Sequence, residues 1–137
     1  MAIKNPSDDK IKEILHTSKR IAVVGLSANP ERTSYMISEA MKNAGYEIIP
    51  VNPSVDEVLG EKAVATLQDI EGPVDIVNVF RRSEFLPEIA KDTVDIGAKI
   101  FWAQLGVENE EAYDYLQEHG VTTVMNRCIK VEHAKFK

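Results

Sequence analysis

The 137-residue sequence contains a single cysteine, Cys128, and only three histidines, His16, His119 and His133. One cysteine cannot form an internal disulfide, and it cannot supply the several thiolates of a structural zinc site. The histidines lie far apart, without a carboxylate or a second histidine at metal-ligand spacing. These absences argue against a disulfide scaffold and against a metal centre, and we expect neither.

The sequence also lacks a long basic run and a long apolar run. Its 16 Lys and Arg residues against 22 Asp and Glu residues give a formal net charge of -6. This balance disfavours a broad surface for nucleic acid or for an anionic membrane. No apolar stretch is long enough to cross a bilayer, and the chain opens on a polar segment without an apolar signal region. We expect one cytoplasmic domain over residues 1–137 that binds neither nucleic acid nor membranes.

A run of four apolar residues before Gly25 is typical of a buried strand that ends in a turn and opens a helix. Gly25 permits a sharp turn, and Ser27, Thr33 and Ser34 bring hydroxyls beside the free N–H groups of a helix start. Such a start is a natural site for an anion. The later glycines of the dinucleotide fingerprint are missing, because Ser27 and Pro30 stand in their places. A simple strand-to-helix connection therefore stays open as the alternative.

Apolar strands and amphipathic helices alternate along the rest of the chain. Ser7 is positioned to cap a first helix. For residues 55–70 the sequence predicts only a turn, a short strand over 63–65 and a helical turn. Further strands are predicted over 46–51, 74–80, 99–102 and 121–125, and helices are predicted to end at Gly45, Gly97 and Gly120. This alternation predicts an α/β, Rossmann-like, doubly wound, mostly parallel sheet of about five strands with helices on both faces.

Ligands bind at the carboxyl ends of the strands in such a sheet, and polar side chains gather at those predicted ends. Four arginines map to this rim and suit phosphate oxygens: Arg32, Arg81, Arg82 and Arg127. The second strand ends in Asn52, where a nicotinamide-binding unit usually carries an acidic residue for the ribose. The rim therefore favours a phosphorylated ligand other than NAD.

Six segments carry a family resemblance, and they occur in order over nearly the whole chain. They are Val-Val-Gly-Leu-Ser at 23–27, Gly-Tyr at 45–46 with Ile-Pro-Val-Asn-Pro at 49–53, Val-Leu-Gly at 58–60, Val-Asp-Ile-Val at 74–77 with Val-Phe-Arg at 79–81, Trp-Ala-Gln-Leu-Gly-Val at 102–107, and Asn-Arg-Cys at 126–128. With these segments the sequence resembles the stand-alone CoA-binding domain family, which is similar to the CoA-binding domain of the succinyl-CoA synthetase α subunit. Any one segment alone is unspecific; the ordered set is specific.

The resemblance implies a Rossmann-like domain with coenzyme A as its cofactor. It implies that the turn takes the pyrophosphate, that the second strand end borders the adenosine, and that Trp102 and Gln104 lie toward the pantetheine arm. The implied contact residues are Gly25, Ser27, Ala28, Arg32, Thr33, Ser34, Asn52, Pro53, Phe80, Arg81, Trp102 and Gln104.

One position departs from the pattern of the synthetase relatives. Those relatives carry a lysine directly after Asn-Pro, near the ribose phosphate, whereas this chain carries Ser54. Recognition of the 3′-phosphate by that route is therefore in doubt. Arg32, Arg81 or Arg82 would have to supply the positive charge.

The sequence shows no catalytic constellation beside the predicted site, so we expect a non-catalytic binding, carrier or sensor module for CoA or an acyl-CoA. Two alternatives stay open: a component of an acyl-CoA ligase that needs a catalytic partner protein, and an NAD(P)-binding oxidoreductase. A homodimer is open as well. Cys128 is the one residue with nucleophile chemistry; it is either an inert thiol or a redox thiol that forms a mixed disulfide with CoA.

Overall fold

The computed structural model describes residues 3–136. Its main sheet has five strands, all parallel, in the order β2-β1-β5-β6-β7. The strands are β1 (Arg20–Val24), β2 (Glu47–Val51), β5 (Ile76–Val79), β6 (Ile100–Ala103) and β7 (Thr122–Val124). The predicted Rossmann-like α/β fold is confirmed, and the strand order places β5 at the centre, between β1 and β6.

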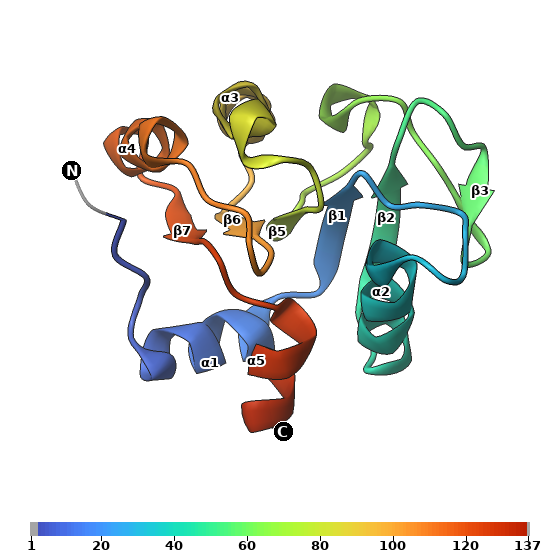
Figure 1. Ribbon diagram of the computed structural model, residues 1–137, viewed down its shortest axis with the longest axis horizontal. Helices are drawn as coiled ribbons and strands as arrows, with labels where there is room; N and C mark the ends of the chain where they lie inside the picture. The colour runs from blue at the N-terminus through green and yellow to red at the C-terminus, as the bar shows by residue number, and fades with distance from the viewer. Residues whose placement is uncertain (1–2, 137) are drawn as a thin grey trace.

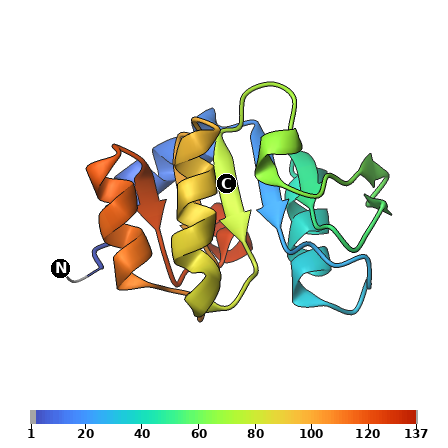
Figure 2. The same ribbon diagram turned by 90° about the horizontal axis from the view of Figure 1, so that it is seen from above.

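The helices cover both faces of this sheet, as the two layers above and below it in Figure 1 show. On one face lie α1 (Asp8–Thr17), α2 (Thr33–Asn43) and α5 (Ile129–Lys135). On the other lie α3 (Leu86–Asp95) and α4 (Glu110–Glu118), which stand side by side in Figure 2. Each strand serves both layers because its side chains alternate: in β1, Val23 packs toward α1 and α2, and Val24 toward α3.

The helix boundaries follow the sequence signals. Ser7 caps α1 by accepting a hydrogen bond from the Lys10 N–H at 3.3 Å, as predicted. Asn109 caps α4 by accepting from the Ala112 N–H at 2.9 Å. Beyond α3 the chain turns at Gly97, whose φ of 71° lies in the left-handed region that glycine tolerates.

The segment between β2 and β5 differs from the prediction. It opens with an antiparallel hairpin of β3 (Glu57–Val58) and β4 (Glu61–Lys62), joined by Leu59 and Gly60, both with positive φ. The pattern did not predict a hairpin because leucine rarely adopts positive φ. The strand predicted over 63–65 is only a single bridge of Val64 to β2, and the predicted helical turn is η1 (Leu67–Asp69).

Asp75 ties the amino ends of the central strands together. Its carboxylate accepts hydrogen bonds from the backbone N–H groups of Lys19 at 2.8 Å and Arg20 at 2.9 Å, and Lys99 lies 3.8 Å away. Partial burial acts to raise the pKa of Asp75, but these hydrogen bonds and the charges of Lys99 and Arg20 together hold the pKa below its usual value. The ionised form therefore stabilises the fold.

We expect Asp75→Asn to lower the free energy of unfolding by about 1 kcal/mol at neutral pH. The lowered pKa means that the stabilisation is present above the unfolded-state pKa of about 4 and is lost as the pH falls through the folded-state value. Urea denaturation of both proteins between pH 7 and pH 3 measures this. The difference should shrink below about pH 4, and Lys99→Met should give a smaller loss at pH 7. A difference that is constant with pH would contradict the assignment.

Candidate functional site

The strand order reverses between β1 and β5, because the chain crosses from β1 to β2 on one side and reaches β5 on the other. At such a switch point the connections after the strands separate and leave a crevice at their carboxyl ends. Two cavities open there and share Gly25, Asn52 and Ser54. They therefore adjoin across the ends of β1 and β2.

We name the two cavities by their surroundings. The switch-point cavity has a volume of about 590 Å³ and is lined by Val24, Gly25, Val51, Asn52, Pro53, Ser54, Ala65, Thr66, Leu67, Arg81, Phe85, Glu88, Ile89 and Asp92. The α2 cavity has a volume of about 610 Å³ and is lined by Gly25, Ser27, Glu31, Arg32, Thr33, Ser34, Asn52, Ser54, Val55 and Phe80. Most of the residues singled out in the sequence line one or the other.

Gly25 lies between the carboxyl ends of β2 and β5. Its φ is +87°, and its N–H donates to the Val51 carbonyl at 2.9 Å. A Cβ at this position would lie 3.2 Å from the Phe80 carbonyl oxygen and 3.1 Å from Cδ of Arg81. Only glycine fits both the conformation and the space. The turn thereby presents bare backbone at the junction of the two cavities.

The loop after Gly25 is ordered by its own hydroxyl groups. Oγ of the buried Ser34 accepts from the Ser27 N–H at 3.0 Å, and the Ser27 hydroxyl accepts from the Asn29 N–H at 3.0 Å. These hydroxyls act first as scaffold for the turn. They shape the entry into α2 and leave the start of the helix facing the α2 cavity.

The amino end of α2 meets the requirements of an anion site. Arg32 occupies the N-cap position with its side chain making no cap hydrogen bond, and the first turn holds no acidic residue. The first N–H groups of a helix have no partner within the helix, and the helix dipole favours negative charge there. Arg32 and Thr33 line the adjoining cavity.

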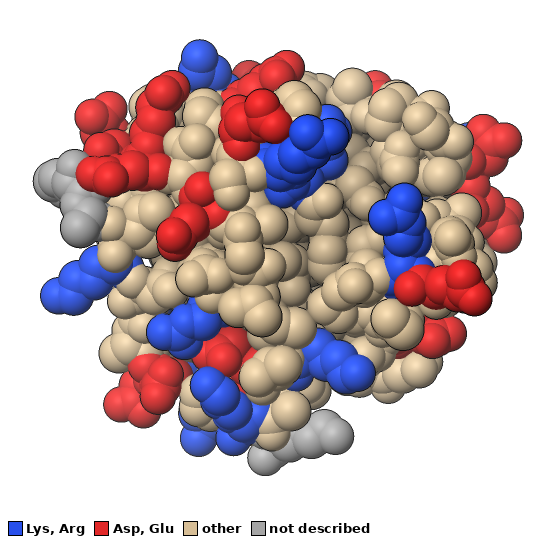
Figure 3. All heavy atoms as spheres, in the orientation of Figure 1, with Lys and Arg blue, Asp and Glu red and all other residues tan. Residues whose placement is uncertain are grey.

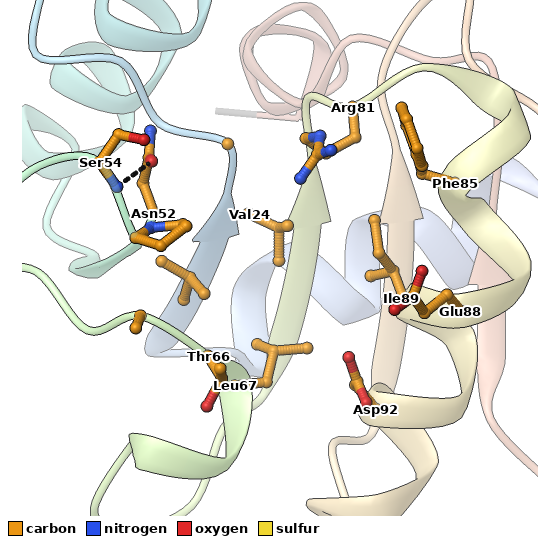
Figure 4. A pocket seen from close by; sticks show the side chains of 14 residues that line it. Val24, Asn52, Ser54, Thr66, Leu67, Arg81, Phe85, Glu88, Ile89 and Asp92 are labelled. Carbon is orange, nitrogen blue, oxygen red and sulfur yellow. Dashed lines mark hydrogen bonds between the residues drawn. The ribbon is translucent and has the colours of Figure 1, made fainter.

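Asn52 joins β2 to the glycine turn. Its Nδ2 donates to the Leu26 carbonyl at 3.1 Å and its Oδ1 accepts from the Ser54 N–H at 2.9 Å, the bond dashed in Figure 4. An acidic side chain could not donate the first of these bonds, which gives a structural reason for asparagine. Pro53 and Ser54 follow as exposed residues of the cavity wall.

The walls of the switch-point cavity carry opposite charges. Arg81 reaches in from the end of β5 with its guanidinium 4.6 Å from the Phe85 ring centroid, and Glu88 and Asp92 point in from α3 (Figure 4). Asp92 accepts a hydrogen bond from Gln68 at 3.0 Å. The acidic pair was not singled out in the sequence. The sequence feature that could have identified this pair is the spacing of residues 85, 88 and 92, which places them on one face of a helix.

The structure does not bring Trp102 and Gln104 into either cavity. Trp102 is fully buried against the α1 and α5 layer, and its Nε1–H donates to the Arg127 carbonyl at 2.8 Å. Gln104 is 4% exposed and donates to Oδ1 of Asn78 at 2.6 Å. These side chains belong to the core, so we propose no ligand contact for them. Ala28 is exposed but lies outside both linings.

The predicted rim of four arginines is corrected to two. Arg82 is exposed outside the cavities and lies 3.6 Å from Glu84. Arg127 pairs at 3.1 Å with the buried carboxylate of Glu132. Arg32 and Arg81 alone, of the four, line a cavity. Sequence position predicts at which edge of the sheet an arginine lies, but it does not predict the direction of its side chain.

Cys128 lies at the N-cap position of α5, half-buried against the α1, α2 and α5 layer. It lines neither cavity. Its reaction with a ligand thiol stays a prediction.

On the face seen in Figure 3, acidic and basic side chains are interspersed without a broad basic patch. Within residues 3–136 no cluster of three or more His, Cys, Asp or Glu side chains is arranged to hold a metal ion. No helix in that range has the length and apolar character needed to cross a membrane.

A parallel doubly wound sheet with its cavities at the switch point, beside an uncapped helix start, defines a protein of the Rossmann-like class. Residues 19–134 match the family described as CoA binding domain. The chain belongs to this family, which confirms the resemblance found in the sequence.

Two relatives are similar to the chain over its whole length. The uncharacterized protein YneT of Bacillus subtilis is 62% identical over 135 residues, which is 98% of this chain and 100% of YneT. A hypothetical protein from Pyrococcus horikoshii OT3 has 34% identity and a TM-score of 0.93, with 99% of each chain covered.

A third relative is a much longer enzyme subunit. The α subunit of acetate–CoA ligase (ADP-forming) II from Pyrococcus furiosus is 25% identical over 122 residues. The match covers 81% of this chain but 27% of that subunit. The shared part corresponds to one domain's length.

Proposed function

We propose that the chain binds coenzyme A or an acyl-CoA at the carboxyl ends of β1, β2 and β5. The pyrophosphate lies over the start of α2, where backbone N–H groups and Arg32 stabilise its charge. The adenosine occupies the switch-point cavity between Pro53 and Arg81, against the apolar walls of Val24 and Ile89. The observation that carries this proposal is the junction at Gly25, where both cavities meet a bare backbone turn.

We propose further that the chain itself performs no reaction. Neither cavity is lined by a histidine or a cysteine from the described residues 3–136. No imidazole and no thiol is thus available in these linings as a general base or a nucleophile. This points to a binding, carrier or sensor module, which we place in the cytoplasm.

A second candidate is a ligase component that works with a catalytic partner protein. The likeness to the α subunit of acetate–CoA ligase (ADP-forming) favours it. In this version the chain holds the CoA moiety, and the partner supplies the reacting groups. The match covers 27% of that subunit, so the functions carried by the rest of the subunit would have to come from other chains.

Isothermal titration calorimetry tests the binding proposal. We expect coenzyme A and acetyl-CoA to bind in the micromolar range, and NADH and NADPH to give no heat of binding. Asn52 supports the second expectation, since its side chain is occupied by Leu26 and Ser54 and offers no carboxylate to a ribose. Binding of NADH but not of coenzyme A would overturn the proposal in favour of an oxidoreductase. Acyl-CoA formation only after addition of a partner fraction would support the ligase component.

A further inference from the structure

The charges around the two cavities do not match a ligand with three phosphoryl groups. The linings hold two cations, Arg32 and Arg81, against three carboxylates, Glu31, Glu88 and Asp92. Coenzyme A carries a pyrophosphate and, on the ribose, a 3′-phosphate monoester that alone brings up to about two negative charges. The two cations and the start of α2 are enough to balance the charge of the pyrophosphate. Little positive charge is then left for the 3′-phosphate.

We propose that this site binds coenzyme A without using its 3′-phosphate, and that Glu88 and Asp92 disfavour a phosphate on the adenosine end. This inference rests on the proposed function. It concerns the class of ligand, which consists of compounds that join pantetheine to ADP, with or without a 3′-phosphate on the ribose. The acidic pair is thus a specificity determinant of the site.

The placement of the acidic pair supports this assignment. Glu88 and Asp92 lie one turn apart on α3 and face the cavity that takes the adenosine (Figure 4). Gln68 holds Asp92 by a 3.0 Å hydrogen bond, so this carboxylate is fixed in the wall. A phosphate beside these two carboxylates is repelled, whereas the exocyclic amino group of adenine can donate a hydrogen bond to either of them.

The cations near the pair are either assigned to the pyrophosphate or lie outside both cavities. Arg81 is one of the two cations assigned to the pyrophosphate, and Ser54, one of the three residues that line both cavities, has no charge. Arg82 lies beside Glu84, outside both linings. The 3′-phosphate of a bound coenzyme A therefore stays in solvent, with no dedicated partner.

Titration of coenzyme A and 3′-dephospho-CoA against the full chain tests the inference. We expect dephospho-CoA to bind at least as tightly as coenzyme A. The double variant Glu88→Gln with Asp92→Asn should improve coenzyme A affinity by about three- to tenfold, with a smaller change for dephospho-CoA. High salt should reduce this gain, since screened charges repel less. Ser54→Lys should increase the affinity for coenzyme A and leave the affinity for dephospho-CoA unchanged.

A charge-matched control is available on α4. Glu111→Gln with Glu118→Gln removes two exposed carboxylates that line neither cavity, and it should leave the preference unchanged. Coenzyme A binding to the parent more tightly than dephospho-CoA, beyond experimental error, would overturn the inference while leaving the proposed function intact. Absence of binding by either ligand would overturn both.

Discussion

Replacing Arg81 by alanine is expected to weaken coenzyme A binding by about 10- to 100-fold. Among the described residues, Arg81 is the cation that lines the switch-point cavity, and its guanidinium is oriented by the Phe85 ring at 4.6 Å. Charge-assisted contacts between arginine and phosphate contribute about 1.5–3 kcal/mol each, which converts to that loss of affinity. Titration calorimetry at a fixed, moderate salt concentration measures it.

Two further variants make the test specific. Arg32→Ala, at the start of α2, should weaken binding in the same direction, and Arg81→Lys should lie between the parent and Arg81→Ala because a lysine keeps the charge without the planar fork. Arg82→Ala is the matched control, since Arg82 is adjacent in sequence, exposed and outside both linings. If Arg32→Ala and Arg81→Ala both bind coenzyme A as tightly as the parent, the ligand binds elsewhere.

The fold and the position of the site could be predicted because they depend on short-range patterns. The apolar run before Gly25, the cap at Ser7, and the alternation of strands with helices each reflect a local requirement of backbone geometry. A parallel sheet then brings the strand ends to one edge. This reasoning gave the edge on which both cavities lie.

The makeup of the site could not be predicted to the same extent, because it depends on tertiary packing. Trp102 and Arg81 both stand at strand ends, yet one side chain is fully buried and the other lines a cavity. Which of the two sheet faces each side chain joins follows from the strand register. Which arginines are engaged elsewhere follows from the carboxylates beside them, Glu84 for Arg82 and Glu132 for Arg127. Glu88 and Asp92 enter the site only because α3 packs over the switch point.

Trp102 gives the largest expected effect on stability. Its indole is fully buried in the layer formed by α1, α2 and α5, and its N–H satisfies the Arg127 carbonyl at 2.8 Å. Trp102→Ala should lower the free energy of unfolding by about 3–5 kcal/mol, through the cavity that it leaves and the lost hydrogen bond. Urea denaturation measures this loss.

Because the alanine variant is at risk of not folding, Trp102→Phe separates a core role from a ligand role. Phenylalanine keeps an aromatic ring but removes the N–H, so we expect a loss of about 1–3 kcal/mol in stability, the cost of a partly buried carbonyl without its donor. Coenzyme A affinity of the folded variant should stay within about twofold of the parent, a difference below the effect of one hydrogen bond. The opposite pattern, unchanged stability with weakened binding, would show that the ligand reaches Trp102 by opening the layer between β6 and α5.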